Sequence, residues 1–339
     1  MAKRVVVVGG TGNMSTGIVK QLVEQGYDVT IYARGGSILS PHKEARVIKG
    51  DRHDGSYIEV MKKEHFDIAI DMIGFVKQDA IDSYEAFQDV ERFVFCSTGA
   101  VATPFLAEKQ PIREENVQKH PTWSYGQIKK DCEDFFLSKY YENGFPVTIL
   151  RPATTYGRVP GLIRQVGNIN GAANVWVDRI KKGKPIVTGN EYILRSFMHA
   201  DDAASAFVES LKYEACIGQA YNLVADHAID WGMFHRGMMH AIGKEVEMVE
   251  VPLATLKSFA GKDTFEIGDM INESFIRNGL FSGEKIYRDI PTFKQKVDIN
   301  KGMEMTLEFL ESHNLIPDSD DYPLEDKIIK VQMATRIHD

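Results

Sequence analysis

Tyr125 and Lys129 are the residues of this sequence best spaced for acid–base chemistry. They stand four positions apart at the start of an amphipathic stretch, so a helix places both side chains on one face. A tyrosine with a pKa near ~10 exchanges protons poorly at neutral pH unless a cation stabilises its phenolate. Lys129, assisted by the positive charge of a nicotinamide, can supply that cation and lower the pKa of Tyr125. The spacing alone is common, and its place before the sixth predicted strand makes it informative.

Hydroxyl side chains follow the fifth predicted strand, residues 93–96, at Ser97 and Thr98. Open α/β sheets bind their ligands at the carboxyl ends of the strands. These hydroxyls are therefore placed to meet a ligand. The alternative is that they cap a tight turn of their own backbone.

A glycine-rich turn, residues 9–12, follows the first predicted strand, residues 5–8, and precedes a predicted helix over residues 14–24. Unpaired backbone N–H groups and the helix dipole at such a turn bind a diphosphate. The pattern predicts a dinucleotide site, and an ordinary strand–turn–helix is the alternative. Ser15 stands where the fingerprint has its last glycine, which serves close packing of helix on strand. We expect a slightly shifted helix and retained binding.

Short strand-like runs alternate with amphipathic stretches through the first half of the chain. The runs are residues 5–8, 28–32, 45–49, 68–71, 93–96 and 147–150. Such alternation is typical of a parallel sheet covered by helices on both faces. We predict an α/β fold, a Rossmann-type doubly wound parallel sheet with a smaller C-terminal α/β substrate lobe. The dinucleotide-binding domain is expected at residues 1–160 and about 186–224, and the lobe at about 161–185 and 225–339.

The second predicted strand ends at Ala33 and Arg34 without an acidic residue. An acid at this place commonly binds the ribose 2′-hydroxyl of NAD, whereas a nearby arginine accommodates the 2′-phosphate of NADP. A guanidinium can bind that phosphate through two parallel hydrogen bonds. Arg34 therefore favours NADP over NAD, and an arginine exposed in a loop is the alternative. Asp51, after the third predicted strand, is expected to accept a hydrogen bond from the adenine amine.

The composition argues against several kinds of partner and site. The chain of 339 residues has a net charge of −8, whereas nucleic-acid binding needs clustered Lys and Arg. Its three cysteines lie far apart, so we predict no metal site and expect a reducing compartment. No run approaches the ~20 apolar residues of a membrane span, and no signal peptide is recognisable. We expect a cytoplasmic protein without membrane partners.

Several of these motifs together resemble one known family. Residues 1–222 look like an extended short-chain dehydrogenase/reductase of the NAD-dependent epimerase/dehydratase family. The matching pieces are residues 9–15 and 50–51, Ser97-Thr98-x-x-Val101, Tyr125-x-x-x-Lys129, Arg151-Pro152-x-x-x-Tyr156-Gly157, and Arg195-x-Phe197-x-His199-x-Asp201. Their order and combined spacing are highly specific.

The resemblance implies a role for each matching side chain. Thr98 would hydrogen-bond the substrate oxygen, Tyr125 would exchange its proton, and Lys129 would hold the cofactor ribose. Residues after Pro152 would orient the nicotinamide carboxamide, and Arg195 would lie where relatives acting on nucleotide sugars hold the phosphate. The implied cofactor site comprises Gly9, Thr11, Gly12, Asn13, Met14, Arg34, Asp51, Arg52, Ile73, Gly74, Tyr125, Lys129 and Pro152.

Departures from the family pattern reduce the number of reactions that we expect this chain to catalyse. Members that dehydrate sugars carry Asp-Glu after the threonine, where this chain has Gly99-Ala100, so dehydration is disfavoured. Nucleotide-sugar epimerases usually retain NAD and an acid after the second strand, and Arg34 departs from that pattern. Ala102 replaces a usual tyrosine, which changes the substrate pocket. Trp123 either walls that pocket or packs at the surface.

We therefore expect an enzyme, an NADP-preferring oxidoreductase or epimerase. It would move a hydride to or from a secondary alcohol or ketone of a sugar-like or nucleotide-sugar-like small molecule. The residues leave net redox chemistry and self-contained epimerisation open. The alternative is a catalytically idle family member that binds RNA or senses dinucleotides. Two features oppose it: the net negative charge and the complete set of Thr98, Tyr125 and Lys129. A homodimer remains possible.

Overall fold

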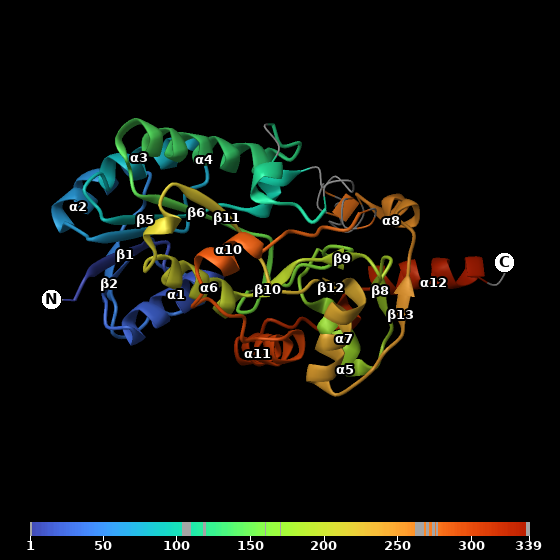
Figure 1. The fold of residues 1–339 in the computed structure, drawn as a ribbon. Helices are drawn as coiled ribbons and strands as arrows, with labels where there is room; N and C mark the ends of the chain where they lie inside the picture. The colour runs from blue at the N-terminus through green and yellow to red at the C-terminus, as the bar shows by residue number, and fades with distance from the viewer. Residues whose placement is uncertain are drawn as a thin grey trace. The chain divides into compact units, whose positions relative to one another are not determined.

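The chain folds into two compact units, each assembled from segments that are distant in the sequence (Figure 1). The computed structural model describes residues 2–103, 110–117, 120–159, 161–169, 171–261, 268, 271–272, 275 and 277–336. The first unit comprises Met1–Thr155, Ala200–Asp226 and Phe281–Lys296. The second comprises Tyr156–His199, His227–Leu280 and Val297–Asp339.

Seven parallel strands form the central sheet of the first unit. In chain order they are β1 (Arg4–Val8), β2 (Asp28–Ala33), β3 (Arg46–Lys49), β4 (Ile68–Asp71), β5 (Arg92–Cys96), β6 (Val147–Pro152) and β11 (Gln219–Leu223). Their order across the sheet is β11-β6-β5-β4-β1-β2-β3, and every neighbouring pair is parallel. The chain starts in the middle, winds to one edge and returns to build the other. This order confirms the predicted doubly wound sheet.

Helices cover both faces of this sheet (Figure 1). One face carries α1 (Asn13–Glu24) and α6 (Ala200–Ser210), and the other carries α2 (Tyr57–Glu64), α3 (Lys77–Ala86) and α4 (Ser124–Asn143). The four valines of β1 are fully buried, because both faces of a parallel strand meet helices. At the β11 edge, α10 (Glu284–Asp289) packs on the strand, and the Lys285 ammonium donates to the Ala220 carbonyl oxygen over 2.9 Å.

The second unit combines helices with short strands. Its helices are α5 (Val175–Lys182), α7 (Trp231–Ile242), α8 (Leu253–Phe259), α11 (Ile299–Ser312) and α12 (Leu324–Arg336). Its strands include β8 (Ile186–Thr188), β9 (Leu194–Arg195), β10 (Phe197–His199), β12 (Ile229–Asp230) and β13 (Met248–Glu250). β8 pairs with β13 in parallel, and β9 pairs with β12 in antiparallel orientation. Among the described residues of the whole chain, no helix has the length and apolarity to cross a membrane.

The bounds of the two units differ most from the predicted domain ranges in two places. Residues 186–199 lie in the second unit, where β8 and β9 find their partners in β13 and β12. Residues 281–296 lie in the first unit, because α10 packs on β11. Pairings between distant segments decide both assignments, and the local sequence pattern does not reveal them. The predicted boundary at Pro160 lies outside the described residues.

An aromatic cluster fills the space between the sheet and α4. The ring centroid of Phe136 on α4 lies 5.0 Å from those of Phe93 and Phe95 on β5, and 6.1 Å from that of Phe145. All four side chains are buried. Stacked and tilted rings at these separations add to the free energy of burial, so the cluster fixes α4 on the sheet.

Replacing Phe136 by alanine should open a cavity in this cluster and lower the free energy of unfolding by ~3–5 kcal/mol. Denaturant titration measures the loss. Tyr141→Ala on the same helix is the matched control, since that side chain is 77% exposed and should change stability by less than ~0.5 kcal/mol. Equal losses in the two variants would contradict the assigned position of α4.

Candidate functional site

The glycine-rich turn after β1 needs its glycines for close packing. Gly9 has a φ of +82°, and a Cβ atom there would lie 2.4 Å from Ile73 Cγ2. A Cβ atom on Gly10 would lie 2.9 Å from Ile31 Cγ2. Bulkier residues would force the turn away from the strand ends. The predicted cofactor residues Gly9 and Ile73 are therefore in direct contact at the carboxyl edge of the sheet.

Ser15 takes over the position of the last fingerprint glycine by bonding within the turn. Its hydroxyl accepts a hydrogen bond from the Gly12 N–H and donates one to the Gly9 carbonyl oxygen, both over 2.7 Å. The side chain is buried in the first turn of α1, next to Asn13 and Met14. The serine thus ties both ends of the loop together. A helix N-terminus with a preshaped loop remains at this edge, as a diphosphate site requires.

A cavity of about 450 Å³ lies beside this turn in the first unit. The predicted residues Gly9, Thr11, Gly12, Arg34, Asp51, Arg52 and Ile73 line it, together with Ala33, Gly35, Gly36, Ser37, Gly50, His53 and Phe75. Its size falls in the range of small-molecule and cofactor sites. Gly9 and Ile73 pack directly against each other in its wall, where a side chain on Gly9 would clash with Ile73. These features fit a dinucleotide.

Arg34 lies at the rim of this cavity. Its side chain is 77% exposed, and its Nη1 atom lies 3.7 Å from Asp51 Oδ2. The following loop is anchored, since the Ser37 hydroxyl donates to the Thr11 carbonyl oxygen over 2.7 Å. The guanidinium is therefore accessible to an anion, while its neighbour Asp51 faces the same cavity.

Arg52 lines the cavity, while its guanidinium lies beneath it; its predicted cofactor contact stays a prediction. Its guanidinium is buried, where Nη1 lies 3.2 Å from both Asp71 carboxylate oxygens and Nη2 donates to the Ser83 hydroxyl and the Asp79 carbonyl oxygen. The Ser83 hydroxyl donates in turn to Asp71 over 2.7 Å. Arg52 lines the cavity, but its charge is committed to this network beneath it. The sequence does not show this, because burial and the partner carboxylates come from other elements.

Thr98 caps the turn that follows β5. Its Oγ1 atom accepts a hydrogen bond from the Ala100 N–H over 3.2 Å at the start of the 3-10 helix η1 (Gly99–Ala102). The capping alternative is thus realised, and the hydroxyl keeps its own hydrogen to donate. A Cβ atom on Gly126 would lie only 2.3 Å from the Ala100 carbonyl oxygen, so α4 starts in contact with this turn. This contact brings the Thr98 turn and Tyr125 together.

Lys129 is buried behind these residues, with 1% of its surface exposed. Its ammonium donates to the carbonyl oxygens of Gly74 over 2.7 Å and Cys96 over 2.5 Å. The nitrogen lies 4.2 Å from the centroid of the Phe95 ring. Burial lowers the pKa of Lys129. The side chain links the segments that follow β4 and end β5 through two of its three N–H donors.

The pKa of Tyr125 is raised rather than lowered. Partial desolvation of the phenol, in a residue that is 43% exposed, raises it to about 12, and the neighbouring thiols of Cys96 and Cys132 act in the same direction. Lys129 directs its ammonium to two backbone carbonyls, which accounts for the missing stabilisation of a phenolate. Residue spacing does not report this desolvation, and the lowering expected from Lys129 together with the nicotinamide charge stays a prediction. The phenol is protonated throughout the neutral range.

A buried ion pair that the sequence analysis did not anticipate supports this arrangement. Glu133, one turn after Lys129 on α4, accepts hydrogen bonds from Arg151 Nε over 2.9 Å and Arg151 Nη2 over 2.7 Å. It also accepts one from the Ser97 hydroxyl. Arg151 immediately precedes Pro152, which ends β6 at the same sheet edge. The available signals were a carboxylate four residues after Lys129 and an arginine before Pro152.

Arg195 belongs to the second unit, where it ends β9 and is buried. Gly279 packs against it, since a Cβ atom there would lie 2.0 Å from Arg195 Nη1. The arrangement fixes the arginine within its own unit. Its predicted phosphate contact stays a prediction.

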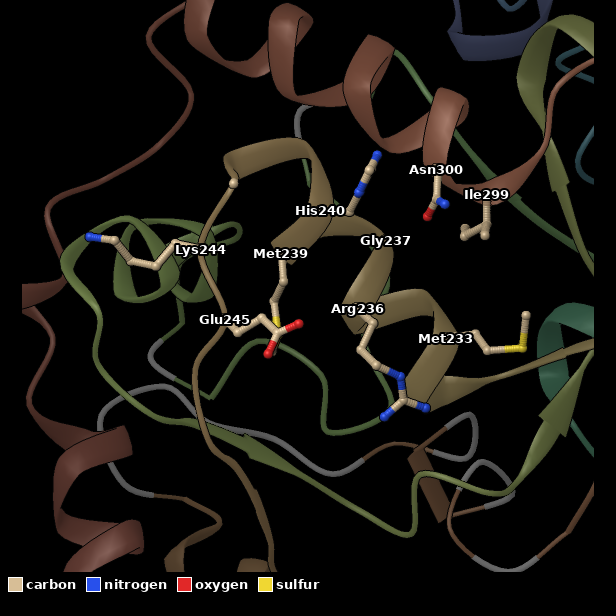
Figure 2. A pocket seen from close by; sticks show the side chains of 10 residues that line it. Met233, Arg236, Gly237, Met239, His240, Lys244, Glu245, Ile299 and Asn300 are labelled. Carbon is tan, nitrogen blue, oxygen red and sulfur yellow. The ribbon is translucent and has the colours of Figure 1, made fainter.

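A second cavity, of about 520 Å³, lies within the second unit (Figure 2). Figure 2 shows Met233, Arg236 and His240 along α7 and Ile299 and Asn300 at the start of α11. Its cations have partners, since Arg236 donates to Glu191 over 2.6 Å and Lys244 to the Lys181 carbonyl oxygen over 2.6 Å. None of the predicted site residues lines it.

Curated relatives cover most of the chain at low identity. Residues 5–223 match the model of a family described as the NAD dependent epimerase/dehydratase family. The 2′-dehydrokanamycin reductase of Streptomyces kanamyceticus is 26% identical over 251 residues, which are 74% of this chain and 69% of that protein. The chloroplast stem-loop binding protein of 41 kDa b from Arabidopsis thaliana is 25% identical over 236 residues, 65% of this chain and 58% of that protein.

Solved structures share the whole fold. An epimerase from Methanothermobacter thermautotrophicus aligns with a TM-score of 0.74 and 21% identity over 93% of this chain and 94% of its own. A UDP-glucose 4-epimerase from Thermotoga maritima, solved with UDP-glucose, aligns with a TM-score of 0.71 and 18% identity. The alignment covers 91% of this chain and 99% of that protein. At these identities the likeness establishes the fold.

Removing the carboxylate of Glu133 should leave Arg151 as an uncompensated buried charge. We expect Glu133→Ala to lower the free energy of unfolding by ~3–5 kcal/mol. Denaturant titration checks this, with Glu142→Ala as control, because Glu142 pairs with Lys139 on the exposed side of the same helix. The control should leave stability almost unchanged. A Glu133→Ala protein as stable as the control would show that the pair does not hold α4.

Proposed function

The chain belongs to the NAD-dependent epimerase/dehydratase family, and we propose that it is a reductase that uses NADPH to reduce a ketone on a sugar-like substrate. The family supports an enzyme of oxidoreductase or epimerase type. Net reduction is the finer proposal. The observation that carries it is geometric: the start of α4 contacts the turn of Thr98, which brings the Tyr125 phenol and the Thr98 hydroxyl to one place at the sheet edge.

A protonated phenol suits the reductive direction. Reduction of a ketone requires a proton at oxygen and a hydride at carbon, and a group that holds its proton at neutral pH can donate it. The glycine-rich turn would hold a nicotinamide cofactor, which would supply the hydride. The Thr98 hydroxyl donates a hydrogen bond to the carbonyl oxygen and orients it towards Tyr125. Tyr125 then transfers its proton to that oxygen, and an alcohol results.

Lys129 acts in this proposal as a holder of the cofactor ribose. Two of its N–H donors are used by Gly74 and Cys96, and the third is free for a ribose hydroxyl. A buried ammonium fixed by two carbonyls moves little, so the ribose is held in one orientation. Ile73, Gly74 and Pro152 would line the same edge. The second unit would supply the substrate lobe, with Arg195 as its candidate phosphate contact.

The preference for NADP rests on Arg34. The guanidinium is accessible at the cavity rim, and β2 ends at Ala33 without the acid that commonly binds a ribose 2′-hydroxyl, although the Asp51 carboxylate lies 3.7 Å from Arg34 Nη1. When the 2′-phosphate binds Arg34, the Asp51 side chain would move away from the guanidinium. Its carboxylate would then accept a hydrogen bond from the adenine amine.

A sugar-like substrate is supported by the relatives. One is named a 2′-dehydrokanamycin reductase, and one structural neighbour contains UDP-glucose. Another relative is named a stem-loop binding protein, which favours RNA binding as a second candidate. The net charge of −8 and the presence of Thr98, Tyr125 and Lys129 at one site oppose that candidate.

Tyr125→Phe removes the phenolic oxygen alone and tests the assignment of the proton donor. Turnover of NADPH with the best ketose of a panel should fall at least ~100-fold, with cofactor affinity nearly unchanged. Tyr141→Phe, at an exposed position of the same helix, should keep full activity. Full activity in Tyr125→Phe would mean that another group moves the proton. Stoichiometric NAD retained through gel filtration of the unmodified protein would instead favour an epimerase.

Arg34→Ala tests the choice of cofactor. Calorimetric titration of the unmodified protein should show tighter binding of NADPH than of NADH, and the variant should lose about 10-fold or more of that preference. Arg46→Ala is the control, because Arg46 pairs with Glu64 and does not line the cavity. Equal affinities of the unmodified protein for the two cofactors would overturn the preference.

A further inference from the structure

The turn that carries Thr98 is packed against an aromatic ring. A Cβ atom on Gly99 would lie 3.0 Å from Phe281 Cζ and 3.2 Å from Ala153 Cα, so a side chain at Gly99 would displace the ring. Phe281 is therefore held directly beside the residue that follows Thr98. Both belong to the first unit.

The other end of this turn meets a second aromatic residue. Ala102 and Ile112 are buried, and Trp123 and Phe281, each partly exposed, pack against them. The backbone N–H of Trp123 donates to Thr103 Oγ1 over 3.3 Å, which fixes the backbone of the tryptophan to the turn. Trp123 also comes two residues before Tyr125.

The Phe281 side of this cluster is anchored to the sheet. Ile112 and Phe281 form a parallel β-bridge, and the Ser282 N–H donates to the Ile112 carbonyl oxygen over 2.8 Å. The Asn222 side-chain amide of β11 donates to the same carbonyl oxygen over 3.0 Å. The ring is thus held by backbone bonds in a position set by the sheet.

We propose that Trp123 and Phe281 form an aromatic wall, which binds the apolar face of a carbohydrate ring beside Thr98 and Tyr125. The inference rests on the proposed function and names the surface that recognises its substrate. An aromatic face that keeps partial exposure next to reacting groups can cover the C–H face of a saturated ring, while Thr98 and Tyr125 meet its oxygens. Gly99 and Ala100 bring no charge to this turn, so shape and apolar contact select the ring.

Tryptophan fluorescence can report on this wall, because the chain contains three tryptophans and the other two are buried. Trp176 and Trp231 are each 1% exposed and belong to the second unit. Protein saturated with NADP⁺ is titrated with a panel of methyl glycosides and ketoses, and separately with uridine and thymidine nucleotides. We expect at least one sugar to change the emission, and Trp231→Phe to preserve that change.

Two variants of Trp123 separate the change in tryptophan emission from the affinity for the sugar. Trp123→Phe keeps a ring and should bind the sugar, as thermal shift reports, without the emission change. Trp123→Ala removes the ring and should weaken sugar binding about 10-fold. Three results would overturn the wall. The emission could change with the nucleotides alone, it could still change in Trp123→Phe, or no sugar could change it at all.

The outcomes for the wall and for the proposed reduction are distinguishable. A Trp123-dependent sugar response together with full turnover in Tyr125→Phe would support the wall and refute the proton donor. Loss of turnover in Tyr125→Phe with sugar affinity unchanged in Trp123→Ala would refute the wall alone.

Discussion

The buried pair of Glu133 and Arg151 is the interaction on which the site depends. It joins α4 to the end of β6, and through Ser97 to the end of β5. Removing two charges from water is costly, and here at least three hydrogen bonds to the carboxylate compensate. Because Lys129 lies one helical turn before Glu133, the pair also sets the depth of the lysine between the strand ends.

Close contacts through glycine complete the positioning. Gly126 lets the start of α4 touch the carbonyl oxygen of Ala100, and Gly99 lets an aromatic ring lie against the same turn. Both contacts occur within three residues of Thr98. A side chain at Gly99 or Gly126 would push these elements apart. The geometry of the site therefore depends on the absence of a Cβ atom at two glycines as well as on hydrogen bonds. Packing in protein interiors leaves little slack to absorb such a change.

The sequence revealed the sheet and the glycine-rich turn because both depend on local pattern. Consecutive valines in β1 and alternating helices are readable along the chain, and the predicted residues at the strand ends do share one edge. Arg52, Glu133 and Phe281 were not readable, because their partners are distant and their burial is a tertiary property. The desolvation that raises the pKa of Tyr125 was not readable either, since spacing to Lys129 says nothing about it. Unit membership of residues 281–296 likewise follows from packing on β11.

The interleaving of the two units has a consequence for how such a protein can diversify. The chain passes from one unit to the other after residues 155, 199, 226, 280 and 296. A single recombination event within the gene would join part of one unit to an incomplete copy of the other. Exchange of a whole unit as a module would therefore need several coordinated crossovers. Changes that stay within one continuous segment, such as substitutions, leave both units complete.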